Sequence, residues 1–226
     1  MSKANKTEDI NVANVISIAG TANSTAQPDT KYQILYAALK RFSEHGYDST
    51  TLNDIANDVG IKKPSIMYHF SSKELLYREV ILNEFKDWIF LMSDATGKEV
   101  HGWDQVEQLL RAAFTFFEQH PYFVKIARRE ALDPDSLFSS ELGTALKPLI
   151  DRGAKFLENE MKHGRLKKYD ARQLLITGYG AAFSYLSDSS LVSAVIDGDP
   201  LSVKALATRR EHVIEVLREA IAPKQD

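Results

Sequence analysis

Apolar residues recur at helical spacing along almost the whole chain from residue 28 onward. In the first such segment they stand at positions i, i+3, i+4 and i+7, which places them on one face of a helix: Leu35, Ala38, Leu39 and Phe42. No run alternates between apolar and polar residues as a half-buried strand does. The pattern therefore predicts an all-α protein without internal repeats, in which a small N-terminal domain precedes a larger helical bundle.

Local signals at helix ends divide the N-terminal part into short elements. Gly46 and Gly60 are expected to end the first and second helices, because glycine readily adopts the left-handed conformation that closes many helices. Thr51 and Asp54 have the spacing of a capping box, with Asp in the usual place of Glu. The second helix is therefore expected to be short and to lie between these residues and Gly60.

A longer helix is predicted to follow. Ser71 and Glu74 form an S-x-x-E box that marks its start, and Gly97 marks its end. Its apolar stripe is expected to consist of Leu75, Leu82, Phe85, Ile89 and Met92. Further helices are expected to end near His120, Leu132, His163, Ser187 and Ile221.

The segment from residue 51 to residue 70 is the most informative part of the chain. Two short helices meet at Gly60, whose left-handed turn lets the second helix cross the first steeply. Ile61, Ile66 and Phe70 are expected to bury the second helix. The remaining side chains then point away from this small core: Lys62, Lys63, Ser65, Tyr68 and His69.

The charge distribution favours DNA as the partner of this segment. The net charge of the chain is -3, so any DNA contact must come from a local patch. Between Ile61 and Lys73 there are three lysines and no acidic residue. Lysines that reach phosphates gain affinity by releasing condensed counterions. The pattern is typical of a helix-turn-helix, although two amphipathic helices joined by glycine also occur in bundles that do not bind DNA.

Two kinds of DNA contact are expected. Residues near helix N-termini, together with Tyr68, are predicted to hold the phosphate backbone: Thr50, Thr51, Tyr68 and Lys73. Residues of the second helix are candidates for contacts with base edges: Lys62, Lys63, Ser65 and His69. Pro64 is expected to start that helix, because its fixed φ suits the first turn.

The stretch from Lys31 to Val80 resembles the N-terminal domain of TetR/AcrR-family regulators. It contains, in order, ILYAALKRFSEHGYDSTTLNDIANDVGI, a short helix ending in YHF, and SSKELLYREVI. The resemblance implies an all-helical homodimer with a three-helix DNA-binding head and a ligand-binding and dimerisation body. Most members are repressors that a small molecule releases from DNA. The chain departs from the family in having Lys62 where Ser or Thr is usual and Met67 where Tyr is frequent.

This organisation divides the chain into three parts. Residues 1–27 are polar and lack a durable period, which predicts a flexible tail. Residues 28–75 are expected to form the helix-turn-helix domain, and residues 76–226 the C-terminal ligand-binding and dimerisation domain. A dimer would also allow two heads to read the half-sites of a palindromic, double-stranded operator.

The C-terminal part is rich in aromatic residues. One hypothesis is an apolar cavity for a small hydrophobic effector, and the alternative is ordinary core packing. The candidate lining residues are Phe114, Phe117, Tyr122, Phe123, Ile126, Phe156, Tyr179 and Phe183. Small residues in the GYGAAF segment, together with the apolar stripe of the last helix, predict close helix approach in a dimer interface or within one subunit.

Other chemistries find little support in the sequence. The chain has no cysteine, so disulfides, thiolate zinc sites and cysteine nucleophiles are excluded. No dinucleotide fingerprint, P-loop or nucleophile elbow is present, and the six histidines lack metal-ligand spacing. We therefore expect no enzyme activity, cofactor or metal, and no membrane contact in a cytoplasmic protein. The competing interpretation is a helical ligand-binding or interaction protein with a degenerate DNA-binding head.

Overall fold

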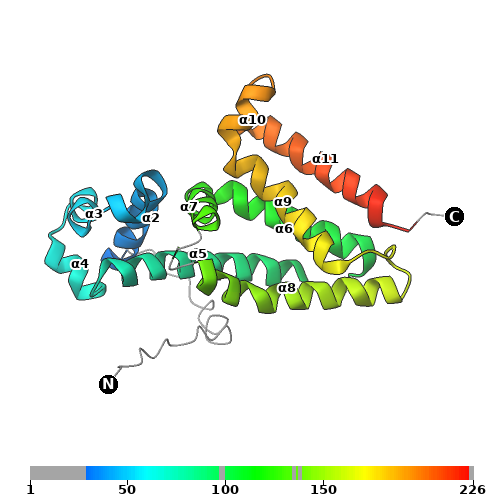
Figure 1. The fold of residues 1–226 in the computed structure, drawn as a ribbon, viewed down its shortest axis with the longest axis horizontal. Coiled ribbons are helices and arrows are strands. Elements are labelled where there is room, and N and C mark those ends of the chain that lie inside the picture. The colour runs from blue at the N-terminus through cyan, green and yellow to red at the C-terminus, as the bar shows by residue number, and fades with distance from the viewer. Residues whose placement is uncertain (1–28, 97–99, 134–135, 137–138, 224–226) are drawn as a thin grey trace.

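The chain folds into helices joined by short connections. The computed structural model describes residues 29–96, 100–133, 136 and 139–223, and these contain no strand. Their helices, shown in Figure 1, are α2 (Thr30–Ser49), α3 (Leu52–Val59), α4 (Lys63–His69), α5 (Lys73–Thr96), α6 (Gly102–Gln119), α7 (Pro121–Leu132), α8 (Ser139–Lys162), α9 (Ala171–Ser187), α10 (Ser189–Val195) and α11 (Val203–Ile221). The all-α prediction is confirmed, while the predicted tail lies outside the described residues. Within those residues, no helix has the length and apolar character needed to cross a bilayer.

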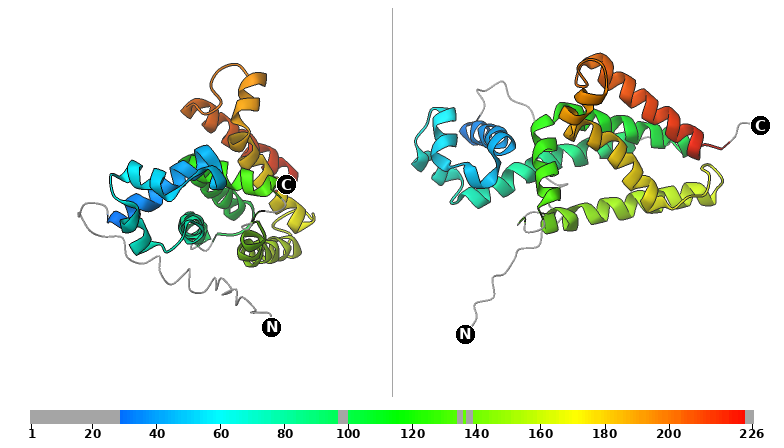
Figure 2. Two further views of the ribbon diagram at one scale, coloured as in Figure 1. Left: turned by 60° about the vertical axis from the view of Figure 1, so that its left-hand side comes forward. Right: turned by 45° about the horizontal axis from the view of Figure 1, so that its top comes forward.

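The N-terminal helices α2, α3 and α4 form a head at the start of α5, as the views in Figure 2 show, and α2 packs against both α5 and α7. The signals expected at their ends are present. Gly46 has φ +83° and interrupts the helical backbone of α2, and Gly60 closes α3 in the left-handed conformation with φ +76°. Thr51 and Asp54 form the expected reciprocal capping box at the start of α3. The predicted three-helix head is thus confirmed.

Helix α5 differs from the prediction in its start and in its buried face. The backbone amide of Leu75 donates to Ser72 Oγ at 3.1 Å, so Ser72 takes the capping role expected of Ser71. Leu75 is 45% exposed, so the predicted stripe is wrong at this residue, whereas its member Phe85 is 5% exposed. The buried residues of α5 are Leu76, Tyr77, Val80, Ile81, Glu84 and Phe85. The reason is that α5 packs against α2 along its first half and against α6 later, so its apolar positions follow two partners rather than one stripe.

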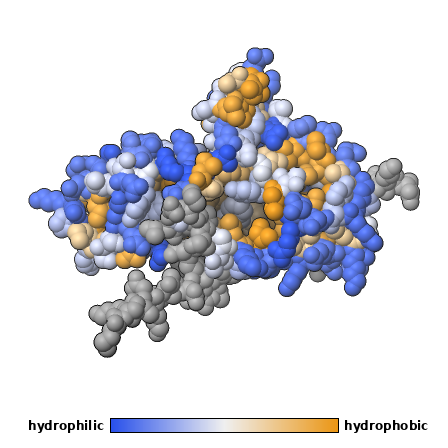
Figure 3. Space-filling model, in the orientation of Figure 1, coloured by the Kyte–Doolittle hydropathy of each residue, from blue (hydrophilic) through white to orange (hydrophobic). Residues whose placement is uncertain are grey.

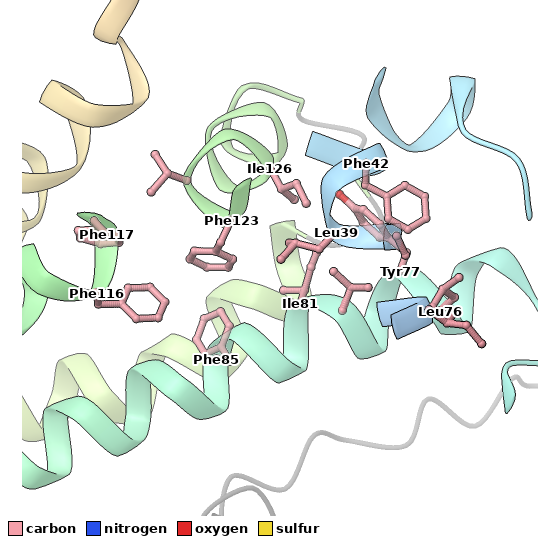
Figure 4. Packing of buried hydrophobic residues seen from close by; sticks show 14 of the residues in the cluster. Leu39, Phe42, Leu76, Tyr77, Ile81, Phe85, Phe116, Phe117, Phe123 and Ile126 are labelled. Carbon is pink, nitrogen blue, oxygen red and sulfur yellow. The ribbon is translucent and has the colours of Figure 1, made fainter. Parts of the chain in front are cut away.

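One hydrophobic core runs through the head and the body. Figure 4 shows side chains from α2, α5, α6 and α7 arranged along α5, and these residues belong to one cluster of buried side chains. The labelled members are Leu39, Phe42, Leu76, Tyr77, Ile81, Phe85, Phe116, Phe117, Phe123 and Ile126. The division proposed between residues 75 and 76 therefore falls at the start of a shared helix rather than at a break in packing. A change in the body can reach the head through this packed core.

A second cluster lies at the far end of the body, around Trp103, Leu157 and Ile214. Beside it, the carboxylate of Glu160 is only 1% exposed. It accepts hydrogen bonds from the Gly102 amide at 2.7 Å and from Arg165 Nε and Nη2 at 2.6 and 2.7 Å. These bonds tie α8 to the first residue of α6, and the bonds from Arg165 lower the pKa of Glu160 to about 2.

Replacing this carboxylate should destabilise the protein near neutral pH. The folded-state pKa of Glu160 lies below its unfolded value, so its stabilisation is complete above about pH 5 and disappears as the pH falls toward 2. We expect Glu160→Gln to lower the free energy of unfolding by about 2 kcal/mol at pH 7. The deficit should shrink to about half near pH 3. Urea unfolding across this pH range measures it, with the exposed Glu158→Gln as control, and a deficit independent of pH would contradict the assignment.

Candidate nucleic-acid interface

The apolar side of helix α4 packs against the rest of the head. The Ile61 amide donates to the carbonyl of Ala56 at 2.9 Å across the left-handed Gly60, which fixes the turn between α3 and α4. Ile66 is fully buried and Phe70 is 5% exposed, so this side of α4 is anchored in the core. Because α4 has only seven residues, its opposite face is left as a narrow outer surface.

That outer surface collects most of the residues predicted to contact DNA. Tyr68 is 86% exposed, and His69 is half-buried with its ring edge-on to the Tyr68 ring. The other predicted DNA contacts with exposed side chains are Thr51 at the start of α3 and Lys62, Lys63, Pro64 and Ser65 at the start of α4. Among the described residues, no acid lies within ion-pair distance of Lys62 or Lys63. We call these seven residues, with Tyr68 and His69 included, the α4 surface.

The acidic residues of α3 are held by other partners. Asp58 accepts hydrogen bonds from the Arg41 guanidinium, one of them from Nη2 at 2.7 Å, and these lower the pKa of its carboxyl. Asp54 is bound by Thr51 in the capping box, which lowers its pKa as well. Both carboxylates are thereby partnered within the head, and the lysines of the α4 surface remain available for DNA.

Two of the residues predicted to contact phosphates, Thr50 and Lys73, bond to carbonyls inside the head. Thr50 is 1% exposed and its hydroxyl donates to the carbonyl of Gly46 at 2.8 Å. The Lys73 ammonium donates to the carbonyls of Tyr47 at 2.8 Å and Thr50 at 3.1 Å, and lies 4.1 Å from the Tyr47 ring centre. The break of α2 at Gly46 leaves carbonyls that face the start of α5, and these two side chains satisfy them. Both therefore support the head from inside.

Two basic residues beside the α4 surface were not predicted from the sequence. Lys31 from α2 and Arg78 from α5 line a groove together with Tyr68 and Phe70. Lys31 also lies 3.7 Å from Glu79 and 5.6 Å from the centre of the Phe70 ring. They come from helices on either side of α4 in the chain, so no local motif could have joined them to it.

The aromatic residues proposed to line an effector cavity are divided by the structure. Five of the eight are at most 4% exposed within the continuous core: Phe114, Phe117, Phe123, Ile126 and Phe183. Phe156 packs against the second cluster, and Tyr179 is 46% exposed, stacked on Phe183 with ring centres 5.0 Å apart. Edge-to-face packing, such as that of Phe117 on Phe183 at 5.5 Å, fills the space between the rings. Ordinary core packing thus accounts for most of this set.

A cavity of about 380 Å³ lies instead where the head meets the body. Of the predicted lining residues only Tyr122 contributes to it. Its walls are Tyr32, Leu35, Tyr36 and Leu39 from α2, Val80, Asn83, Glu84 and Asp87 from α5, and Gln119, His120, Pro121 and Tyr122 from the α6–α7 turn. Within it, Glu84 Oε2 is 2.6 Å from His120 Nδ1.

Exposed apolar side chains gather on the helices expected to form a dimer. Ile176 of α9 is 57% exposed, and Val203 and Val216 of α11 are 87% and 51% exposed. Figure 3 shows a further hydrophobic patch at the tip formed by α10. Within the GYGAAF segment, a side chain at Gly178 would meet Leu110 of the same subunit at 3.6 Å, whereas Gly180 faces open space. Gly178 therefore allows close packing inside the subunit, whereas Gly180 lies on an open face of α9.

Comparison with known proteins agrees with this architecture. The family described as "Bacterial regulatory proteins, tetR family" matches residues 34–80, and "Tetracyclin repressor-like, C-terminal domain" matches residues 103–217, just over half of the chain. The regulator RutR of Escherichia coli K12 is 26% identical over 201 residues, covering 89% of this chain and 94% of RutR. The biofilm-operon negative regulator IcaR of Staphylococcus epidermidis is 32% identical over 141 residues, covering 62% of this chain and 68% of IcaR.

Solved structures share the fold at lower identity. The ketosteroid regulator KstR2 of Mycobacterium tuberculosis superposes with a TM-score of 0.65 at 21% identity, covering 92% of this chain and all of KstR2. The fatty acid degradation regulator FadR of Bacillus halodurans gives 0.66 at 15% identity, covering 85% and 96%. The structures support the fold, and the two family matches show that the chain belongs to the TetR family of DNA-binding transcriptional regulators, whose members are not enzymes.

Proposed function

We propose that the protein represses transcription by binding a palindromic, double-stranded operator as a homodimer through its α4 surface. The observation that carries this proposal is the pair Lys62 and Lys63, which have no ion-pair partner among the described residues and lie at the exposed start of a short helix whose other face is anchored in the core. Repression is supported by the similarity to IcaR, which is named a negative transcriptional regulator. The cytoplasm, where such an operator would be reached, is the proposed location.

The two kinds of DNA contact are assigned as follows. Lys62, Lys63, Ser65 and His69 are proposed to reach base edges in the major groove. Thr51 and Tyr68 are proposed to hold phosphates, as are the neighbouring Lys31 and Arg78 at the groove beside α4. Thr50 and Lys73 are left out of this set, because their polar atoms are bonded inside the head.

Dimerisation is proposed to bury the exposed apolar faces of α9 and α11. An isologous four-helix contact would cover Ile176, Val203 and Val216 from both copies. It would hold the two α4 helices about 34–36 Å apart, one helical turn of DNA. The dimer thereby gains affinity that a single head lacks.

Release is proposed to follow the binding of a small, apolar effector in the body. The half-exposed Tyr179 ring stacks on the buried Phe183, which gives such a molecule a point of contact with the aromatic core. Because α5 packs on both α2 and α6, a shift in that core would change the separation of the heads. Support for the chemical class comes from the names of fold neighbours that regulate fatty acid and ketosteroid metabolism.

Binding to the DNA upstream of its own gene tests the proposed function. Fluorescence anisotropy with a labelled upstream fragment should show saturable binding that ends at two protomers per site. The logarithm of the binding constant should fall linearly with the logarithm of salt concentration, by about 0.9 for each phosphate contact. A scrambled fragment of equal length is the control. Binding no tighter than to that control would favour the alternative of a degenerate head.

A further inference from the structure

We propose that the cavity between α2, α5 and the α6–α7 turn is a binding site for a small organic cation. The ligand would be an ammonium group carrying an apolar or aromatic substituent. The site is distinct from the aromatic core of the body, since Tyr122 is its only member of that predicted set. Its regulatory consequence rests on the proposed function, whereas binding of the cation itself does not.

The charge of the cavity favours a cation as its ligand. Two carboxylates, Glu84 and Asp87, line it, and none of its lining residues is a lysine or arginine. Glu84 is only 7% exposed, and its Oε2 is engaged by His120. An ammonium group bound in the cavity would offer both positive charge and N–H donors to these carboxylates.

Three tyrosines line the cavity together with these carboxylates. Tyr36 and Tyr122 stand edge-to-face with ring centres 6.3 Å apart, and Tyr32 lines the same space. Tyr32 and Tyr36 are both more than half exposed, so their rings are accessible to a ligand in the cavity. Aromatic faces next to carboxylates attract ammonium groups through cation–π and ionic interactions.

The size and composition of the cavity select among cations. Its volume of about 380 Å³ suits a small organic molecule and exceeds what a single metal ion needs. Within the described residues, no group of three or more His, Asp or Glu side chains is arranged to hold a metal. Leu35, Leu39 and Val80 supply an apolar wall for a substituent on the ammonium. An organic amine could contact the carboxylates with its ammonium group and the apolar wall with its substituent.

The position of the cavity gives binding a consequence for DNA. Its walls come from α2 in the head and from the α6–α7 turn in the body, so a bound molecule contacts both. The same two parts are also joined by Arg129, whose Nη1 donates to the carbonyl of Phe42 at 2.8 Å. A ligand that contacts both sides favours one orientation of the head, and must shift operator affinity wherever the DNA-bound orientation differs. The operator must then change amine affinity by the same factor.

Calorimetric titration of the full-length protein with benzylamine tests the site directly. Benzylamine should bind, and the neutral benzyl alcohol, of nearly equal size, should bind roughly tenfold more weakly or not at all. Asp87→Asn and Tyr36→Leu should each weaken benzylamine binding, by about threefold to tenfold. Asp94→Asn on the same helix and Tyr169→Leu on the α8–α9 connection lie outside the lining and should leave it unchanged.

Each outcome separates this proposal from the proposed function. Equal binding of benzyl alcohol, absence of benzylamine binding, or full binding by Asp87→Asn and Tyr36→Leu would overturn the cation site. Amine binding with no effect on operator affinity would overturn its regulatory role alone. Because neither Asp87 nor Tyr36 belongs to the α4 surface, both variants should bind operator normally without amine. Failure of the wild-type protein to bind operator would instead overturn the proposed function and leave the amine titration intact.

Discussion

Lys63→Glu is expected to weaken operator binding by at least about 100-fold while leaving the folded dimer intact. Each protomer loses one contact worth roughly 1–3 kcal/mol, and a palindromic site loses two of them. The new carboxylate also faces phosphates. Since Lys63 is exposed at the start of α4 and has no ion-pair partner among the described residues, its replacement removes no contact that stabilises the head. Fluorescence anisotropy measures the affinity, and thermal unfolding checks the fold.

The matched control is Lys168→Glu, which makes the same charge change at an exposed lysine on the connection between α8 and α9. It should bind operator nearly as the wild type does, apart from a small non-specific effect of net charge. If both variants bind equally well, the α4 surface is not the DNA-binding surface. If both lose affinity equally, net charge rather than local contact governs binding.

The head could be predicted from the sequence because its signals act within a few residues. Gly60, the Thr51–Asp54 capping box and Pro64 each fix a backbone feature through partners at most four positions away. The outward face of α4 follows from them, since Ile66 must be buried once the turn is fixed. Local chemistry therefore suffices to place Lys62, Lys63 and Tyr68 on the surface.

Features that depend on distant partners could not be predicted in this way. The buried face of α5 is set by α2 early and by α6 later, and no single period describes both. The aromatic residues share a composition typical of either a cavity or a core, and only their packing decides between them. The cavity at the junction unites residues as far apart as Tyr32 and Tyr122. Its tyrosines were each visible in the sequence, but nothing local linked them.

The role of Lys73 also depends on partners that are distant in the sequence. Its replacement should distinguish a structural role from a DNA-binding role. Its ammonium bonds to carbonyls of Tyr47 and Thr50, more than 20 positions earlier in the chain. Losing such charge-assisted bonds at a half-buried site should lower the free energy of unfolding by about 2 kcal/mol in Lys73→Met. Operator affinity should fall as well, because the end of α2 and the start of α5 together seat α4.

The salt dependence of operator binding distinguishes the two roles. A residue that supports the head from inside releases no counterion, so Lys73→Met should keep the wild-type slope of log affinity against log salt. Lys31→Met, which removes a lysine proposed to hold a phosphate beside α4, should lower the magnitude of that slope by about 2 per dimer. It should cost little stability, because the ion pair of Lys31 with Glu79 is exposed. If Lys73→Met instead unfolds like the wild type and shows the reduced slope, its ammonium leaves the carbonyls for a phosphate when DNA binds. The phosphate contact of Lys73 that the sequence predicts would then form in the DNA complex.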